Sequence, residues 1–522
     1  MLIFLYIFIA VILIVLGIVY IKVIRPQKRI YDIFRAQGIN GEPFVPIIGQ
    51  LPEMRRQRQA DLIMTYQENL AKKHGNIFLF CFGPITRIVI TEPDMLADVF
   101  SRANAQNYKK PPMMANVFQP IIGVQNLLVG HGYEHERARR MINPAFHHIN
   151  LKSMISIITD QTAKTIQELL STVSSDDEKG ARVNGQIQFN ALTLSIIASS
   201  AFGSGFETIT NAKEIICRTF TELLDAIVYR SLFMVNQIPI ISKLPFWKKP
   251  IVDNGARLIS ELIDKIITER RQGHSTSMCN GADLLDLLLS AVDDQGIPFT
   301  DEQIKDEALT FVFAGSETTG NLMSWIFYIL TTHHHVLVAC QEEVDRILPN
   351  GIEPTNEHLS KLVVCEAIIN ETLRLYPPAP LFTRYCTHEH VIGTERQLRI
   401  PVGATITINS YILHRRSDLW DRPDEFDYTR WMRDPKTDLK PKLPHPFAYL
   451  PFAAGSRNCI GQNFALLEAK IMLAMFIQRC NFELVPGQKI VPDLKITMRP
   501  KYGLWLNISK RHIKKTYTKL CE

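Results

Sequence analysis

The feature that most constrains the fold of this 522-residue chain is one unusually long helical pattern. It begins at Thr300-Asp301-Glu302-Gln303, where a hydroxyl residue followed three places later by Gln predicts a capping box. The pattern runs to about Thr332, which is about 33 residues or ~50 Å of helix, far longer than a mean globular helix. Only a large domain can surround such a rod. Gly315 near its middle costs about 1 kcal/mol relative to Ala, so it predicts a close approach of another group or a local distortion.

Shorter helical patterns dominate the rest of the chain, and strand patterns are few. We expect a mainly α protein with small β-sheets in one large domain. Helices are predicted at 93–102, 134–147, 151–171, 190–202, 209–229, 254–272, 282–292 and 463–478, and strands at 77–82, 87–91, 397–400 and 405–409.

The first residues form a separate apolar segment. Leu2 to Ile21 carries no charge and is long enough, at roughly 1.5 Å per residue, to cross a ~30 Å hydrocarbon core. The first charge is Lys22, and three further basic residues follow by Arg29, which favours a cytoplasmic side for what comes next. A cleaved signal peptide is the alternative, but a basic n-region and a small-residue cleavage site are not evident. We therefore expect a transmembrane anchor at 1–24, a basic and Pro/Gly-rich linker at 25–52, and a catalytic domain at 53–522.

Composition excludes several classes of function. Lys and Arg total 58 against 52 Asp and Glu, which is too balanced for nucleic acid to be the main partner. The nine cysteines are scattered with no CxxC pair, so a disulfide framework or structural zinc site is not expected. A reducing, cytosol-facing environment fits this usage.

One cysteine stands in distinctive surroundings, within Phe452-Ala-Ala-Gly-Ser-Arg-Asn-Cys-Ile-Gly461. Glycines at 455 and 461 allow a tight turn and a close approach to a flat ligand. Arg457 brings a cation near the Cys459 thiol, and the helix predicted after Gly461 points its positive end at the sulfur, which favours a thiolate. If Cys459 is considered without its neighbours, the alternative is that it is an ordinary buried cysteine in a glycine-containing loop.

The whole string resembles, at every defined place, the haem-ligand loop FxxGxRxCxG of the cytochrome P-450 family. The resemblance implies the cytochrome P-450 fold, with haem b between the long central helix and the helix after the cysteine loop. It implies Cys459 as the axial thiolate ligand of the iron, Phe452 and Gly461 beside it, and Arg457 paired with a haem propionate.

Two further motifs appear in the order that the family shows. Glu371-Thr-Leu-Arg374 places an acid and a base on one helical face, and alone such a pair is weak and common. By resemblance Arg430 joins Glu371 and Arg374 in a structural network.

Ala314-Gly-Ser-Glu-Thr-Thr319 lies in the middle of the long helix and matches the family's oxygen-activation motif. Acid and hydroxyl side chains there can relay protons, so we expect Thr318 and Glu317 to be catalytic. The alternative is that the Thr318 hydroxyl bonds its own backbone.

The resemblance also suggests further contacts. Arg139, Arg384 and Arg457 are expected at the haem propionates, since the arginine fork suits carboxylates. His135 stands where the family usually has Trp. Some apolar residues in a loop-rich region or near the expected haem are predicted to contact substrate. Packing in the core is an equal alternative for them. They are Phe118, Ile121, Phe311, Ala314, Leu381 and Phe382.

The implied function is a monooxygenase that inserts one atom of O2 into a small lipophilic substrate. Electrons are expected from NADPH through a flavoprotein reductase, received on a basic face with Lys109, Arg137 and Arg140. The expected place is the endoplasmic reticulum membrane, as a single-pass protein with membrane lipid as a neighbour and its catalytic domain cytoplasmic. The alternatives are an O2-independent haem-thiolate isomerase or dehydratase, whose relatives often lose the acid–Thr pair, and a non-catalytic haem-binding protein.

Overall fold

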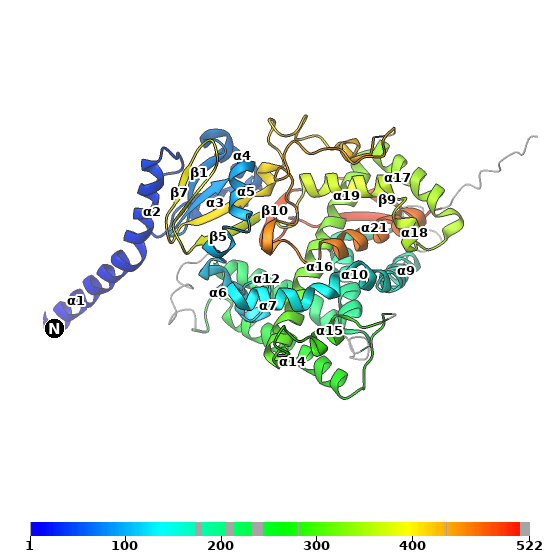
Figure 1. The fold of residues 1–522 in the computed structure, drawn as a ribbon, viewed down its shortest axis with the longest axis horizontal. Helices are drawn as coiled ribbons and strands as arrows, with labels where there is room; N and C mark the ends of the chain where they lie inside the picture. Colours follow the sequence, from blue (N-terminus) through cyan, green and yellow to red (C-terminus); the bar gives the residue numbers. More distant parts are fainter. Residues whose placement is uncertain are drawn as a thin grey trace, which may run out of the picture.

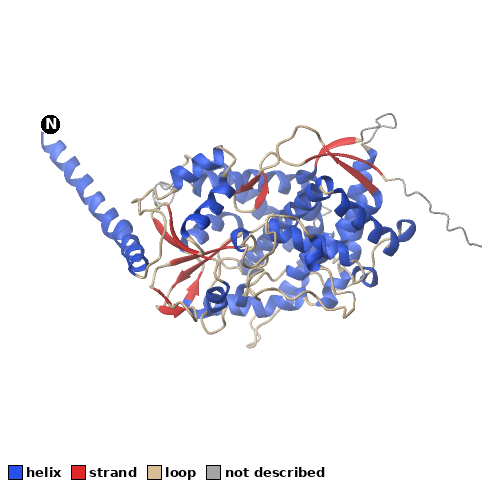
Figure 2. Cartoon of the chain, turned by 90° about the horizontal axis from the view of Figure 1, so that it is seen from above, coloured by secondary structure: helices blue, strands red, loops and turns tan. Residues whose placement is uncertain are grey.

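A computed structural model describes residues 2–172, 180–204, 212–231, 244–279, 281–434 and 436–511. Figure 1 shows a protruding N-terminal helix, a sheet-containing part beside it, and a larger helical part. Figure 2 shows the same division from above, with a further small sheet at the end distant from the N-terminus. The mainly α fold with small sheets agrees with the sequence prediction.

The N-terminal helices form an unbroken rod. α1 (Leu2–Val19) continues through one π-helical segment (Tyr20–Ile24) into α2 (Arg25–Ala36). By length and composition this helix can cross a membrane, and its most apolar stretch is not buried against the protein. In α2, Ile30 and Phe34 are buried, and the Gln27 side chain accepts from the Thr86 N–H. The first part of the predicted linker is thus a helix docked on the sheet.

The main sheet has five strands in the order β1-β2-β8-β5-β3. Its members are β1 (Ile77–Phe82), β2 (Ile85–Ile90), β8 (Thr405–Asn409), β5 (Leu381–Cys386) and β3 (Tyr108–Lys109). β2 and β8 are parallel, and the other pairs are antiparallel. Around this sheet lie α3 (Leu51–Gln59), α4 (Ile63–His74) and α5 (Pro93–Phe100). β6 (His390–Ile392) and β7 (Leu398–Ile400) form a hairpin nearby.

The helical part is built around α16 (Asp301–Thr332), whose Thr300 capping box is present as predicted. The other helices of this part include α7 (Gly132–Ile142), α8 (His148–Ser153), α9 (Ile155–Ser171), α10 (Gly185–Phe202), α12 (Ala212–Ser231), α14 (Lys249–Arg271), α15 (Leu284–Ser290), α17 (His334–Ile347), α18 (Asn356–Leu359), α19 (Val363–Leu375) and α21 (Gln462–Arg479). The short helix α20 (Ser410–Leu413) follows β8 and contacts α4. Two small sheets complete the fold. β4 (Ala181–Asn184), β12 (Trp505–Lys510) and β9 (Cys480–Leu484) form one at the end distant from the N-terminus, and β10 (Pro492–Leu494) pairs with β11 (Met498–Pro500) beside α4 and α16.

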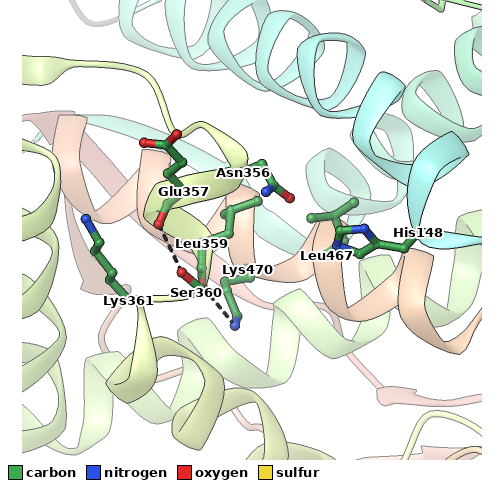
Figure 3. A pocket seen from close by; sticks show the side chains of 8 residues that line it. All are labelled: His148, Asn356, Glu357, Leu359, Ser360, Lys361, Leu467 and Lys470. Carbon is green, nitrogen blue, oxygen red and sulfur yellow. Dashed lines mark hydrogen bonds between the residues drawn. The ribbon is translucent and has the colours of Figure 1, made fainter.

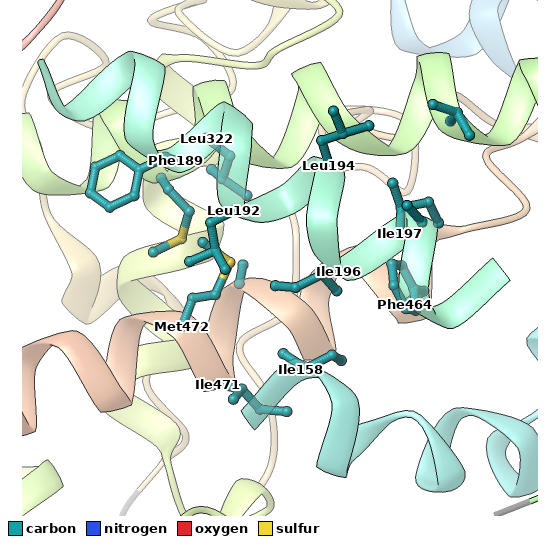
Figure 4. Close-up of a cluster of buried hydrophobic side chains, with 14 of the residues drawn as sticks. Ile158, Phe189, Leu192, Leu194, Ile196, Ile197, Leu322, Phe464, Ile471 and Met472 are labelled. Carbon is teal, nitrogen blue, oxygen red and sulfur yellow. The ribbon is translucent and has the colours of Figure 1, made fainter. Parts of the chain in front are cut away.

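The core between α9, α10, α16 and α21 is closely packed with aliphatic and aromatic side chains (Figure 4). The glycine of the central motif allows part of this packing. A Cβ on Gly315 would lie 2.9 Å from the Ile197 side chain of α10, so the predicted close approach is a neighbouring helix. Gly320, one turn further along, has the same role against Asn190, where a Cβ would meet the side-chain oxygen at 2.0 Å.

One local prediction is wrong. The region of Phe118 and Ile121 was expected to be rich in loops, but both residues lie on helix α6 (Pro112–Ile122). Pro112 occupies the first helical turn, where its missing N–H has no cost, and Gly123 ends the helix at φ +69°. Pro120 inside the helix obscures its pattern in the sequence.

Candidate active site

Some of the predicted functional residues meet around one cavity between α16, α7 and the cysteine loop. The cavity has a volume of about 190 Å³. Its lining residues come from segments far apart in the chain and include Leu127, Leu128, His135, Arg139, Phe311, Ala314, Thr318, Arg457, Cys459 and Gly461.

The cysteine loop is held in a tight turn before α21. The Cys459 N–H donates to the Phe452 carbonyl at 2.9 Å, which closes the loop on itself. Gly455 adopts φ +73°, and a Cβ there would meet the Phe100 carbonyl oxygen at 2.4 Å, so this turn needs glycine. At Gly461, by contrast, a Cβ would meet no atom closer than 3.9 Å. The absence of a side chain at Gly461 therefore leaves open space in the cavity.

Cys459 is the one exposed cysteine among those that the structure describes, although it lies deep in the protein. Its accessible surface faces the cavity. Burial raises the pKa of the Cys459 thiol, and the Gly461 N–H and Arg139 oppose this rise. The loop was expected to favour the thiolate by itself, but burial outweighs the favourable dipole and charge. A bound metal cation, which deprotonates its thiol ligand, would reverse this balance.

Four basic side chains gather at or beside the cavity. Lys110, Arg139 and Arg457 line it, and Arg384 lines a small adjoining pocket together with Arg457. None forms a salt bridge with a carboxylate of the described residues. Burial and mutual repulsion lower the pKa of Arg384 to about 10, and burial does the same for Arg457. For Lys110, burial and the two arginines lower the pKa well below its usual range. Sequence reasoning missed Lys110, because a lysine in a Lys-Lys-Pro-Pro segment carries no motif.

The individual contacts of these cations differ. Arg139 donates to the Asn458 carbonyl at 2.6 Å and to its side-chain oxygen at 2.7 Å, so it braces the residue before Cys459. Arg457 donates to the Gly130 carbonyl at 2.8 Å. Arg384 lies over the Phe100 ring. Each guanidinium keeps donors free for a further acceptor.

His135 also lines the cavity and is buried. Burial and the neighbouring cations lower the pKa of His135 to about 3, so the imidazole is neutral near pH 7. It can donate one hydrogen bond to a carboxylate but adds no charge there.

Haem fits this arrangement. Burying cations without counter-charges is unfavourable, so a cluster of four fits a ligand with more than one negative charge. The two propionates of haem supply that charge, Cys459 supplies a thiolate, and Gly461 leaves room beside it. Cys459, Arg457, Arg384, Arg139, His135 and Lys110 are the residues that would hold the group.

On the opposite wall, α16 presents Thr310, Phe311, Ala314 and Thr318 to the cavity. Ala314 is exposed although it lies at the middle of a core helix, because its surface faces this space. The Thr318 hydroxyl donates to the Ala314 carbonyl at 2.7 Å. The Thr318 hydroxyl therefore does bond its own backbone, as in the alternative interpretation. Its oxygen still borders the cavity and can accept a hydrogen bond from a group there.

Glu317 points to a different side of α16, into a groove shared with α10, α12 and the segment after β11. Burial raises the pKa of Glu317, and Arg499, with a nitrogen 3.6 Å from the carboxylate, opposes the rise. One of its oxygens has no hydrogen-bond partner among the described groups. Glu317 and Thr318 therefore face neighbouring spaces on either side of one helical turn.

A second buried carboxyl close to the cavity was not predicted. Glu468 of α21 is fully buried, and burial raises its pKa well above the usual range, with the nearby Thr319 hydroxyl opposing the rise. Neither oxygen has a hydrogen-bond partner of normal geometry in the described part of the chain. A glutamate within a helical segment, as at Leu467-Glu468-Ala469, does not indicate from the sequence that its side chain is buried.

The predicted structural trio comes together, with both arginines at the Glu371 carboxylate. Arg374 donates two hydrogen bonds to Glu371, at 2.8 and 2.9 Å, and both side chains are fully buried. Arg430 lies 3.4 Å from Glu371, and Trp431 donates to it at 2.8 Å. The remaining donors of Arg374 go to three carbonyls, those of His414, Pro423 and Glu425.

The predicted substrate contacts separate into two groups. Phe311 and Ala314 line the cavity. Phe118 and Ile121 are buried in the core, where Phe118 packs against Phe313 with ring centroids 5.6 Å apart. The third pair lies on β5, where Leu381 is exposed and Phe382 packs on the core of the sheet, and neither is among the residues lining this cavity.

Other surface features are distinct from this site. Figure 3 shows a surface depression between α8, α18 and α21, where Lys470 is already bound to the Leu359 carbonyl and to Glu366. Arg137, expected on an exposed basic face, is buried instead and donates to Asp293 at 2.6 Å, because it turns toward the loop before α16. Arg140 remains exposed.

Comparison with known proteins agrees with this architecture. The family model described as "Cytochrome P450" matches residues 39–507. The chain is 31% identical to the Arabidopsis thaliana "Protein LUTEIN DEFICIENT 5, chloroplastic", over 84% of this chain and 72% of that protein. It is 27% identical to "Cytochrome P450 3A28" of Bos taurus, over 89% and 88%. The solved "cytochrome P450DA heme domain" superposes with a TM-score of 0.76 at 25% identity, covering 91% of this chain and 98% of that one.

Proposed function

The chain belongs to the cytochrome P450 family of haem-thiolate monooxygenases, and from this premise we propose its particular reaction. It inserts one atom of O2 into a small lipophilic substrate, by hydroxylation or epoxidation. Electrons come from NADPH through a membrane-bound flavoprotein reductase. The observation that carries the proposal is the cavity on which Cys459, Thr318 and three of the four cations (Lys110, Arg139 and Arg457) converge.

When bound, haem with a cysteine thiolate ligand supplies the chemistry of O2 activation and O–O cleavage. The residues of this chain position and protect that chemistry. The closed loop around Cys459 presents the sulfur to the cavity, and Arg139 keeps Asn458 in place. Arg384, Arg457 and Lys110 hold the carboxylates of the group at the opposite end.

Glu317 and Thr318 handle protons in this proposal. Burial raises the pKa of Glu317, so its carboxyl holds a proton more readily than an exposed glutamate. From its groove it passes a proton across one turn of α16 toward Thr318, with water as the link. Because the Thr318 proton is directed to the Ala314 carbonyl, the hydroxyl oxygen accepts a hydrogen bond from the linking water. Breaking that backbone bond lets the hydroxyl donate in turn.

The apolar wall of the cavity, formed by Leu127, Leu128, Phe311 and Ala314, suits a lipophilic substrate. The helix at the N-terminus supports anchoring in a membrane, and we place it in the endoplasmic reticulum with the catalytic domain on the cytoplasmic side. Substrate dissolved in the same membrane then reaches the protein at high local concentration. Reductase binding through exposed basic groups such as Arg140 is expected to weaken as salt is added.

The test is O2 consumption and product formation with NADPH and reductase, in wild type and Thr318→Ala. Removing the hydroxyl is expected to lower product formation by about 10²-fold. Ser316→Ala is the matched control, because Ser316 makes the same kind of backbone bond on the same helix but faces the groove. Its product yield should stay near that of wild type.

Two outcomes would favour other functions. Full turnover with a peroxide donor and no gain from reductase would favour an O2-independent isomerase or dehydratase. No consumption of substrate, O2 or peroxide would favour a haem carrier. Independently, Cys459→Ser should abolish the red-shifted carbon monoxide spectrum of a thiolate-ligated haem, and an unaltered spectrum would contradict the assigned ligand.

A further inference from the structure

Residues 123–130 form a strap over the N-terminal half of α16. At its start, Asp306 accepts hydrogen bonds from the N–H groups of Val124 and Gln125, at 2.9 and 2.8 Å. Asn126 clasps its middle, because its side-chain oxygen accepts from two following N–H groups and its amide donates to the Ile122 carbonyl. Gly123 is required at the start, since a Cβ there would lie 1.9 Å from Asp306.

The far end of the strap joins the cation cluster of the active site. The Gly130 carbonyl accepts the hydrogen bond from Arg457 at 2.8 Å. Between the two ends, Leu127 and Leu128 form part of the cavity wall. The strap thus connects α16 to a haem-binding arginine and shapes the cavity on the way.

Beneath the middle of the strap lies Glu307, a fully buried carboxyl. It lies four, seven and eleven residues before Phe311, Ala314 and Thr318, so it shares their helical face, just past the edge of the cavity. Neither of its oxygens has a hydrogen-bond partner of normal geometry among the described groups. An isolated carboxylate in apolar surroundings is so unfavourable that such a group keeps its proton. Burial accordingly raises the pKa of Glu307 to about 8, with the Leu127 N–H opposing and Asp306 adding to the rise.

Among the described residues, no cation contributes to the pKa shift of Glu307. The strap and α6 contain no ionisable residue. On α7, His135 is neutral near pH 7 and Arg137 is bound to Asp293. Charged groups of the adjoining helices are paired with one another, as in Lys305 with Asp264 of α14, and Arg270 of α14 with Asp283 and Asp286 of the α15 capping box.

We infer that Glu307 is a positioning residue whose proton keeps the strap closed against α16, and that the strap loosens when this carboxyl ionises. The charge can form only if water reaches it, and the covering backbone at Leu127 is what excludes water. In a loosened strap the hydrated carboxyl would have an ordinary pKa near 4.5. The closed state therefore loses stability as pH rises from about 4.5 to about 8, by up to about tenfold in the equilibrium constant per pH unit. Loosening shifts both the cavity wall and the carbonyl that orients Arg457.

The test measures hydrogen exchange of the 123–130 amides in the haem-loaded, full-length protein between pH 6 and pH 8. Protection factors remove the intrinsic pH dependence of exchange. In wild type, protection at Leu127 and Leu128 should fall by up to about tenfold per pH unit, whereas in Glu307→Gln it should not change with pH. Asp160→Asn is the control, because it removes another carboxyl whose pKa is raised by burial, on α9, and it should keep the wild-type slope. A wild-type slope retained in Glu307→Gln would overturn the inference.

A second measurement needs no variant. The infrared band of protonated carboxyls should lose intensity in wild type around pH 8, at the upper end of the pH range over which strap protection falls. If the band titrates while the strap stays protected, the inference is wrong. The inference uses the proposed function only to identify the cavity. Since neither measurement needs substrate or reductase, failure here is distinguishable from failure of the monooxygenase assignment.

Discussion

The protein buries charge in two neighbouring regions, and it does so in opposite ways. In the network around Glu371 and Arg374, every strong donor of the arginine meets a carboxylate or a carbonyl oxygen. In the cluster at the end of the cavity, Lys110, Arg384 and Arg457 repel one another and meet no carboxylate of the described residues.

The difference separates a structural site from a binding site. In the closed network every buried charge already has its partners, and removing either partner leaves the other buried and unpaired. In the open cluster the buried cations repel one another as long as no ligand is bound, and an anionic ligand removes this repulsion. Mutations should therefore act on folding in the first region and on haem retention in the second.

The largest expected effect is in the closed network. Glu371→Gln should lower the free energy of unfolding by about 3–5 kcal/mol, because it leaves Arg374 buried without a counter-charge. Urea unfolding followed by circular dichroism measures this loss. Asp421→Asn, which removes an exposed partner of Arg422, should change stability by no more than about 1 kcal/mol. Equal losses in the two variants would contradict the comparison.

Each region contains a buried histidine, and acid should distinguish them. Burial lowers the pKa of both His135 and His414 to about 3, below the ordinary 6.5. The unfolded chain binds these protons first, so stability is complete above about pH 6.5 and falls with decreasing pH, by about 1.4 kcal/mol per pH unit for each histidine.

Haem should change this pH dependence through His135 alone. Propionates beside His135 favour its charged form and raise its pKa, whereas His414 is held by the Arg374 carbonyl and the Leu450 N–H. The slope of stability against pH from 6.5 to 4.5 should therefore be smaller with haem than without it. In His135→Gln the two slopes should agree, and a persistent difference would place its origin elsewhere.

Removing one cation from the open cluster should have opposite effects on the apo and haem-loaded protein. Arg384→Leu should weaken haem retention by about 2 kcal/mol, roughly 30-fold, because a hydrogen bond to a charged group is lost. Without haem the same variant should be as stable as wild type or more so, since repulsion is relieved. Rates of haem transfer to apomyoglobin and unfolding of the apoprotein measure the two effects. A loss of apoprotein stability would contradict an open cluster.

The smallest effect is expected for Lys110→Met, which keeps the length of the side chain. Lysine acts as a point charge without a bidentate fork, so haem retention should fall by only about 1 kcal/mol, or about fivefold. The same haem-transfer assay compares it directly with Arg384→Leu. An effect larger than that of Arg384→Leu would contradict the expectation that Arg384 contributes more to haem retention than Lys110.

Much of the fold and part of the site follow from short stretches of sequence. The capping box at Thr300 and the cysteine loop were predicted because their hydrogen bonds lie within a few residues. The strand at Thr405–Asn409 was predicted from its local residue pattern, although its partner strands lie far away in the sequence. The reading of Arg137 as exposed and of the Phe118 region as loop failed for the complementary reason. Burial of Arg137 depends on Asp293, 156 residues away.

The sequence by itself determined the identity of the sulfur at position 459, the long central helix and the order of the motifs, since these are local and periodic properties of the chain. Only the tertiary structure decided which charges meet. Arg139 reaches Asn458 across 319 residues, Lys110 joins two distant arginines, and Glu307 and Glu468 lose their water under other segments. Desolvation and Coulomb energies depend on distance in space, and one-dimensional spacing does not record that distance.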